Sequence, residues 1–190
     1  MSDPRQIHNL SLIGFMGCGK TTVGRTVASQ LRFDFVDTDE WLERKAGKSI
    51  SEIFTQEGEE RFRAMERELV HEMVQWRRKV IATGGGLGAT AENLVSLKTH
   101  SLVVCLWAPP ELIWQRVRKQ SHRPLLQDPD PLARIRSLLE TRRPIYSQAD
   151  VLINSGNRSV REVAAQVLHQ FQSARPRRDP SEGPNPTSSH

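Results

Sequence analysis

The sequence predicts an α/β protein, a three-layer sandwich in which helices cover both faces of a largely parallel sheet. Five short apolar runs recur along the 190 residues, and helix-like segments of ten or more residues fill most of the gaps between them. Strands of a parallel sheet are buried on both faces and should read as continuous apolar runs, as these do. The predicted strands are Leu10–Phe15, Phe33–Val36, Val80–Thr83, Leu102–Trp107 and Val151–Asn154.

A glycine-rich loop follows the first predicted strand. It runs from Gly14 to Thr21 and matches G-x-x-x-x-G-K-[ST], the pattern of a phosphate-binding loop. A helix is predicted directly after it, over Thr22–Leu31. Glycines let the backbone wrap a phosphate closely, and the helix N-terminus adds a partial positive charge. We therefore predict that Lys20 reaches the outer phosphates of a nucleotide and that the Thr21 hydroxyl ligates Mg²⁺. A chance glycine-rich turn is the alternative.

Two aspartates end the second strand, in the run Asp37-Thr38-Asp39. Strand alternation points both carboxylates the same way, toward the carboxyl edge where α/β folds bind ligands. One could hold Mg²⁺ through water, and the other could accept a proton from a substrate hydroxyl. Alternatively, the two aspartates only cap the end of the strand.

A long charged helix is predicted over Glu60–Gln75, downstream of a capping box at Ser49–Glu52. Within it, Arg63 and Glu66 are three residues apart, so Glu66 could orient Arg63 for binding, or the two could form a plain surface ion pair. Five histidines are expected to be surface or structural residues, namely His8, His71, His100, His169 and His190. The predicted buried side of the helix is Phe62, Met65, Leu69, Val70 and Met73.

Glycines and prolines follow the third and fourth predicted strands. Gly84–Gly86 follow the third strand and permit close approach of the backbone to a ligand, although a flexible turn explains them as well. Pro109 and Pro110 begin a predicted helix, because proline is tolerated in the first turn. The stretch 121–131 is rich in Pro, Asp and Gln and reads as a lid between two helices.

Arginines stand at loop edges in the second half of the chain. Arg123 lies in the predicted lid, where an arginine can neutralise charge on a transferring phosphoryl group. Arg142 lies in an Arg-Arg-Pro-Ile-Tyr run that ends the following helix. The last predicted helix begins at a capping box, Ser159–Glu162, and the chain from Ala174 onward is too polar to bury a core.

Composition limits the classes of function. The formal net charge is +5, which suits either a nucleic-acid binder or a site for small anions. The basic residues are dispersed and arginine exceeds lysine, which favours recognition of phosphate and carboxylate. Cys18 and Cys105 form no CxxC pair, so neither a disulfide nor a metal or redox role is expected for these cysteines, although Cys18 near Lys20 could be alkylatable. We expect no membrane or nucleic-acid partner, a monomer, and a cytoplasmic location, although a processed organelle protein would look the same.

Taken in order, these motifs resemble the shikimate kinase family over about Leu10–Phe171. The matching signatures are GxxGxGKTTxG from Gly14, DTD at 37–39, FRxxE at 62–66, GGG at 84–86, RPLL at 123–126 and RRPIY at 142–146. The resemblance implies a P-loop NTPase of the nucleoside monophosphate kinase-like class, with a five-stranded parallel sheet and a lid. It implies one kinase domain over 1–173, followed by a disordered Pro/Ser/Arg-rich tail over 174–190.

The resemblance also implies a reaction and a set of site residues. The reaction is ATP-dependent phosphorylation of a shikimate hydroxyl to give shikimate 3-phosphate and ADP, a step in aromatic amino-acid biosynthesis. The implied catalytic residues are Lys20, Asp39 as the base, and Arg123. Mg²⁺ is assigned to Thr21 and Asp37, with Asp37 acting through water. The implied shikimate ligands are Asp39, Arg63, Gly84, Gly85, Gly86 and Arg142. The implied nucleotide contacts are Gly17, Cys18, Gly19, Lys20, Thr21, Thr22, Arg116, Arg123, Asn157 and Arg158. Of these, Arg116 is implied to pack on the adenine, and the loop around Ser155 to Arg158 is implied to flank the base.

Two other functions are alternatives. A gluconate kinase of the same architecture would share the phosphate loop, but we would not expect the DTD, FRxxE, GGG and RRPIY motifs together. A non-catalytic ATP-binding relative should have lost Lys20, Asp39 or an arginine of the site, and all are present.

Overall fold

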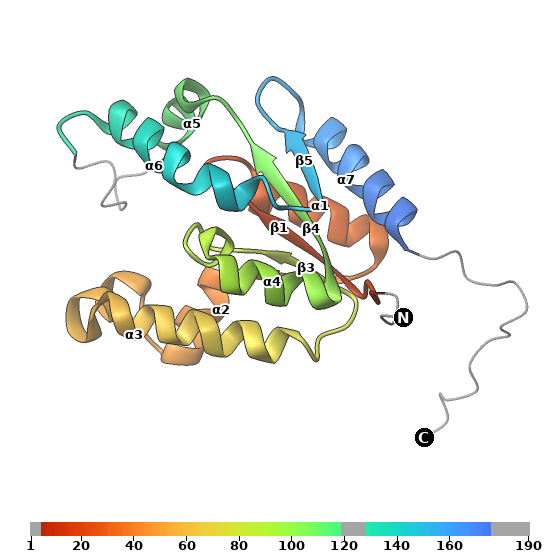
Figure 1. The fold of residues 1–190 in the computed structure, drawn as a ribbon, viewed down its shortest axis with the longest axis horizontal. Coiled ribbons are helices and arrows are strands. Elements are labelled where there is room, and N and C mark those ends of the chain that lie inside the picture. The colour runs from red at the N-terminus through yellow and green to blue at the C-terminus, as the bar shows by residue number, and fades with distance from the viewer. Residues whose placement is uncertain (1–4, 119–127, 176–190) are drawn as a thin grey trace, which may run out of the picture.

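A five-stranded sheet forms the centre of the computed structural model, which describes residues 5–118 and 128–175 (Figure 1). All strand pairs are parallel, in the order β2-β3-β1-β4-β5. The predicted strand ends are confirmed to within two residues: the strands are β1 (Asn9–Ile13), β2 (Asp34–Asp37), β3 (Lys79–Ala82), β4 (Ser101–Trp107) and β5 (Val151–Asn154). Because β1 lies in the middle, the loop after it emerges at the centre of the carboxyl edge, where the strand order reverses.

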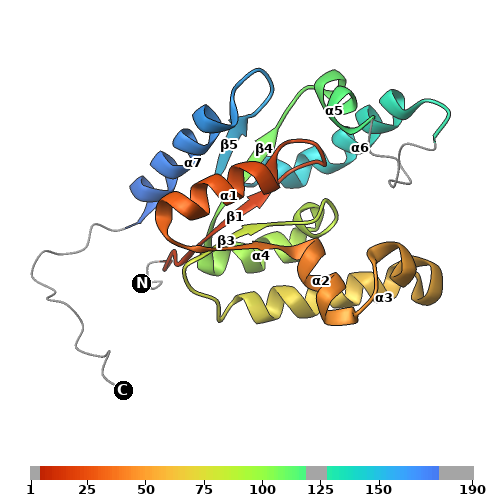
Figure 2. The ribbon, with the colours of Figure 1, turned by 180° about the vertical axis from the view of Figure 1, so that it is seen from behind.

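Helices cover both faces of this sheet and complete the predicted three layers. Figures 1 and 2 show α1 and α7 on one face and α3 and α4 on the other. The buried residues of β4 alternate accordingly: Leu102, Val104 and Leu106 pack toward α1 and α7, whereas Val103 and Cys105 pack toward α3 and α4. The helices are α1 (Lys20–Leu31), α2 (Thr38–Ala46), α3 (Ile50–Met73), α4 (Ala91–His100), α5 (Pro110–Val117), α6 (Pro131–Tyr146) and α7 (Val160–Ala174), with a short 3₁₀ turn η1 (Leu87–Ala89).

Helix α3 is kinked at Gly58, whose φ of 83° and ψ of 170° are not helical. The kink separates a first part, with Ile50 and Phe54, from the charged helix predicted over Glu60–Gln75. All five residues of the predicted buried side of that helix are buried. A positive φ of this size strongly favours glycine, so Gly58 permits the change of direction.

The three helix starts that capping boxes or prolines marked are confirmed, whereas α1 begins at Lys20, two residues before its predicted start. Both capping boxes form, with the Ser49 and Ser159 hydroxyls accepting from N–H groups three residues on. Pro110 stands in the first turn of α5. Ala174, the first residue of the predicted tail, is the last residue of α7, and the tail beyond 175 lies outside the described residues. Within the described ranges, no helix is both long and apolar enough to cross a membrane.

Candidate active site

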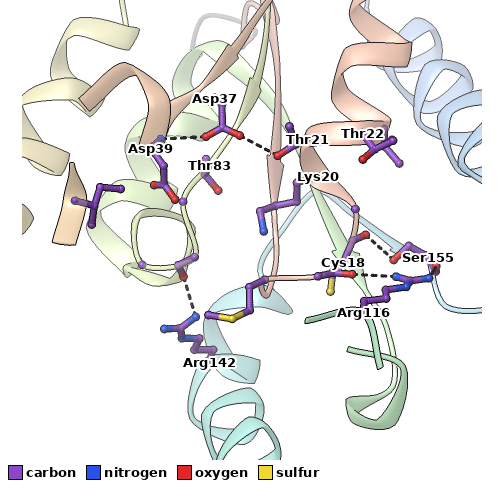
Figure 3. A pocket seen from close by; sticks show the side chains of 18 of the residues that line it. Cys18, Lys20, Thr21, Thr22, Asp37, Asp39, Thr83, Arg116, Arg142 and Ser155 are labelled. Carbon is purple, nitrogen blue, oxygen red and sulfur yellow. Dashed lines mark hydrogen bonds between the residues drawn. The ribbon is translucent and has the colours of Figure 1, made fainter. Parts of the chain in front are cut away.

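A cavity of about 660 Å³ lies at the carboxyl edge of the sheet (Figure 3). Its lining comes from segments at or after the ends of all five strands, so residues far apart in sequence meet there. The phosphate loop forms one wall, and α3 with the loop after β3 forms another. All six predicted nucleotide contacts of the phosphate loop line the cavity: Gly17, Cys18, Gly19, Lys20, Thr21 and Thr22.

The phosphate loop leads into the N-terminus of α1. Gly17 and Gly19 have φ of 75° and 89°, conformations that glycine adopts readily. Gly19 is the N-cap, and no side chain caps the helix there. The amides of the first turn and the helix dipole therefore favour an anion. The Lys20 ammonium lies over the loop and donates to the carbonyl oxygens of Gly14 and Phe15, at 2.9 Å each.

Asp37 and Asp39 both line the cavity, although not for the predicted reason. The expectation that strand alternation orients them is wrong, because the strand ends at Asp37 and α2 begins at Thr38. The Asp37 carboxylate caps α2, accepting from the Asp39 N–H at 3.1 Å. Its other oxygen accepts from the Thr21 hydroxyl at 2.8 Å, which places Asp37 beside the phosphate loop. The alternative that both aspartates only cap the strand end is therefore wrong, because Asp37 caps a helix and both residues line the cavity.

The three glycines after β3 each lie against a different side chain of the cavity. A Cβ at Gly84 would overlap the Asp39 carboxylate, and a Cβ at Gly86 would overlap the Arg63 guanidinium. A Cβ at Gly85 would lie 3.4 Å from Arg142 Nη1. Close packing of side chains against this backbone therefore explains the triplet better than flexibility does.

Arg63 is held by two carboxylates. Its guanidinium donates to Glu66 at 2.7 Å and to Glu59 at 2.9 Å. Burial alone would lower the pKa of Arg63, but the bonds and charges of Glu66 and Glu59 raise it. Glu66 is 2% exposed, and burial raises its pKa despite the neighbouring Arg63. The pair is thus not the plain surface ion pair considered above, since its acidic partner is buried.

Arg142 approaches the cavity from α6. Its Nη1 donates to the Gly85 carbonyl at 3.0 Å, and its guanidinium carbon lies 5.2 Å from the centre of the Phe15 ring. Arg63 and Arg142 therefore both lie against the glycine triplet. Glu66 orients the Arg63 guanidinium, and the Gly85 carbonyl orients that of Arg142. Two arginines placed in this way can bind a planar carboxylate.

The loop after β5 forms the end of the cavity beyond the phosphate loop. Arg116 of α5 ties the two loops together, donating to the carbonyls of Gly17, Ser155 and Gly156 at 2.8–3.0 Å. Arg158 lines the cavity, where a nucleotide could reach it. Asn157 is exposed and is not part of the lining, so its predicted contact with the nucleotide has no support in this geometry.

Cys18 departs from the sequence prediction. The thiol is 1% exposed, and burial raises its pKa against the opposing charges of Lys20 and Arg116. Burial also raises the pKa of Cys105, to about 12. Neither cysteine forms a disulfide. The thiol of Cys18 is therefore not the reactive group that its sequence position suggested.

Several lining residues were not predicted from the sequence. Ile50 and Phe54 bring apolar surface from the first part of α3. Val160 contributes from the start of α7, whereas Ser155 belongs to the loop around 155–158 that the resemblance had placed beside the base. Apolar residues of this kind carry no motif, and only the fold brings them to the cavity. Arg123 and most of the predicted lid lie outside the described residues.

The fold and this cavity define a P-loop kinase built like the nucleoside monophosphate kinases, with its phosphate loop facing the side chains of Asp39, Arg63 and Arg142. The family model for shikimate kinase matches residues 16–172. The chain belongs to the shikimate kinase family, whose reaction is the ATP-dependent phosphorylation of shikimate in the shikimate pathway.

Individual relatives agree with this assignment. Shikimate kinase from Thermodesulfovibrio yellowstonii is 44% identical over 164 residues, covering 86% of this chain and 95% of the relative. A shikimate kinase from Thermus thermophilus is 44% identical over 169 residues, covering 88% and 92%. Among solved structures, shikimate kinase from Acinetobacter baumannii in complex with shikimate has a TM-score of 0.83 at 39% identity, covering 89% and 95%. A gluconokinase from Sinorhizobium meliloti, at TM-score 0.58 and 14% identity, shares the fold alone.

Proposed function

We propose that this protein transfers the γ-phosphoryl group of ATP to a hydroxyl of shikimate, giving shikimate 3-phosphate and ADP. The observation that carries the proposal is the joint placement, in one cavity, of a phosphate loop and of Asp39 with Arg63 and Arg142 around the glycine triplet. Shikimate is a carboxylate with three hydroxyls. Two guanidinium groups suit its carboxylate, and an aspartate suits its hydroxyls.

In the proposed reaction, the residues of this chain mainly position the reactants and neutralise charge. Lys20 exchanges its bonds to the loop carbonyls for bonds to the outer phosphates. The Asp39 carboxylate accepts the proton of the attacking hydroxyl. Arg63 and Arg142 hold the substrate carboxylate, so that the hydroxyl faces the phosphate loop.

The donor set also fits Mg²⁺, which we propose as the metal that accompanies ATP. The described residues contain no group of three or more His, Cys, Asp or Glu that could hold a metal ion by themselves. Mg²⁺ needs no such group, because it keeps several waters and binds through one or two protein oxygens and the substrate phosphates. The Thr21 hydroxyl and Asp37 carboxylate, 2.8 Å apart, are such oxygens. When bound, the ion neutralises charge on the phosphates.

The metal assignment can be tested at Asp37. Asp37→Asn keeps an oxygen to cap α2 but removes the negative charge, so the Mg²⁺ concentration for half-maximal rate should rise about tenfold, as expected for the loss of a charged partner. Glu40→Gln is a control on the exposed side of the same helix. An unchanged Mg²⁺ dependence in Asp37→Asn would contradict the assignment.

The lid remains a proposal from the sequence. We propose that Arg123 reaches the phosphates when both substrates are bound, which would exclude water from the transfer. Arg123→Ala should then slow phosphoryl transfer without unfolding the protein. Hydrogen exchange over 121–131 should fall only when nucleotide and shikimate are bound together.

A coupled assay of ADP release tests the activity itself. ADP should form with ATP and shikimate, and at most slowly with ATP alone or with gluconate in place of shikimate. Turnover with gluconate would favour the rival sugar-acid kinase, and release that ignores the acceptor would contradict both. A monomeric state and a cytoplasmic location stay predictions.

A further inference from the structure

Ser155 makes a contact that the phosphate-loop motif does not describe. Its hydroxyl donates to the carbonyl oxygen of Cys18 at 2.8 Å, although the two residues are 137 positions apart (Figure 3). A longer contact of 3.2 Å reaches the Trp107 carbonyl. A hydroxyl has a single proton to donate, so the shorter bond to Cys18 is the better one.

The fold fixes Ser155 at this position. It follows β5 directly, and its N–H donates to the Trp107 carbonyl at 2.8 Å, continuing the ladder between β4 and β5. The next residue, Gly156, donates its N–H to the Asn154 side chain at 2.7 Å and so turns the chain. Ser155 is 4% exposed, which keeps its hydroxyl bond away from water.

The bond determines how the peptide between Cys18 and Gly19 is turned. In a trans peptide, the carbonyl of one residue and the N–H of the next point in opposite directions. Because the Cys18 carbonyl points to Ser155, the Gly19 N–H points the other way. Gly19 is the N-cap of α1 and lines the cavity, so its N–H belongs to the group of amides that face an anion there.

We propose that Ser155 is a positioning residue for phosphate binding, which acts through the Cys18 carbonyl to hold the Gly19 amide toward the phosphates of the nucleotide. Arg116 donates to the carbonyls of Gly17 and Ser155 and so links the same two loops. The loop after β5 is therefore held against the phosphate loop by two side chains, Ser155 and Arg116. The proposal rests on the proposed use of ATP, but it concerns binding and is tested without turnover.

The competing explanation is that Ser155 only shapes the end of the cavity that receives the nucleoside. The two explanations differ for inorganic tripolyphosphate, which has phosphates and no base. If Ser155 acts through the phosphate loop, Ser155→Ala weakens tripolyphosphate and ADP by a similar factor. If it acts on the nucleoside end, ADP alone is weakened.

Calorimetric titration of the whole chain with ADP and with tripolyphosphate tests this. We expect Ser155→Ala to weaken both by about threefold to tenfold, the range for one hydrogen bond. Ser155→Cys keeps the size with a weaker donor and should fall between wild type and alanine. Ser159→Ala is the control, because it removes the α7 cap nearby and should lower stability without weakening either ligand.

A second readout is the Gly19 amide signal in ¹H–¹⁵N NMR spectra of the ligand-free protein. It should shift in Ser155→Ala and remain in place in Ser159→Ala. Unchanged tripolyphosphate affinity in Ser155→Ala and Ser155→Cys would overturn the proposal, as would weakening of ADP alone. If the alanine variant does not fold, the cysteine variant decides between the same outcomes. Absence of shikimate-dependent turnover in the wild-type protein would count against the proposed function and not against this inference.

Discussion

Each glycine of the triplet after β3 leaves room for a different functional side chain, which makes single substitutions informative. Gly86→Ala should displace the Arg63 guanidinium and raise KM for shikimate more than tenfold. Gly84→Ala should displace the Asp39 carboxylate and lower kcat instead. Neither glycine has a positive φ, so the effect comes from contact and not from backbone strain.

Gly85→Ala is the matched control, because its Cβ would meet Arg142 only at 3.4 Å. Steady-state kinetics with shikimate varied at saturating ATP separate the three variants. Equal effects at all three positions would mean that the loop matters only as a whole.

A substitution at Lys20 tests the proposed binding of the nucleotide phosphates. Lys20→Ala removes a positive charge from the phosphoryl group in transfer, and kcat should fall roughly a hundredfold or more. The side chain is not part of the apolar core, so the thermal midpoint should change little. Wild-type turnover by a folded Lys20→Ala protein would be incompatible with the assigned role.

At the scale of residues, sequence reasoning located side chains whose pattern is local and failed where burial decides. Lys20 and Thr21 line the cavity as predicted, because the phosphate-loop motif fixes their spacing, while their roles stay predictions. The reactivity suggested for Cys18 was wrong, because its 1% exposure raises the thiol pKa more than Lys20 lowers it. Ser155 could not be assigned its contact with Cys18, since the sequence does not say which loop lies against which.

At the scale of elements, prediction followed the strength of the local signal. Capping boxes and Pro110 fix helix starts by backbone chemistry, and all were found. The start of helix α2 was not predicted, because the run Asp37-Thr38-Asp39 is compatible with both the end of a strand and the start of a helix. The kink at Gly58 was not predicted either, because the backbone conformation of a glycine within a helical pattern cannot be inferred from the sequence.

The Gly58 kink links the stability of α3 to the substrate wall. No atom lies within 4 Å of a Cβ placed there, so Gly58→Ala meets a purely backbone cost at φ 83° and ψ 170°. The cost should be about 1–3 kcal/mol in unfolding free energy. Relief of that strain by straightening α3 would move Ile50 and Phe54 away from the cavity, so KM for shikimate should also rise.

Gly47→Ala provides the comparison. Gly47 also has a positive φ, 66°, and open space around its Cβ, but it ends α2 outside the cavity lining. It should lose about 1 kcal/mol of stability with KM for shikimate unchanged. Urea unfolding and steady-state kinetics check both variants. A rise in KM for Gly47→Ala as well would mean that the kink has no special link to the substrate wall.

At the scale of the whole molecule, the cavity and a buried polar cluster lie at opposite edges of the sheet. The cavity occupies the carboxyl edge, where α-helix N-termini and loops meet. The opposite edge carries a buried polar cluster in which Asn9 Nδ2 donates to the Trp76 carbonyl at 2.7 Å and lies 3.0 Å from His100 Nδ1. His100 is therefore a buried structural residue outside the lining of the cavity, in agreement with the prediction for this histidine.

His100 makes stability depend on pH. It is 3% exposed, and burial, aided by the charges of Arg77, His8 and Arg5, lowers its pKa from 6.5 to about 4. Between those values the unfolded chain binds a proton that the folded chain does not, so stability rises with pH and is lost as the pH falls. From pH 7 to pH 5 this histidine should remove about 2 kcal/mol of unfolding free energy. In His100→Gln, the decrease in unfolding free energy between pH 7 and pH 5 should be smaller than in wild type, even if the variant is less stable at both pH values. The control is His71→Gln, at an exposed histidine, which should show the same decrease as wild type. Urea unfolding at the two pH values measures the difference, and an equal loss in His100→Gln and wild type would assign the acid sensitivity to other groups.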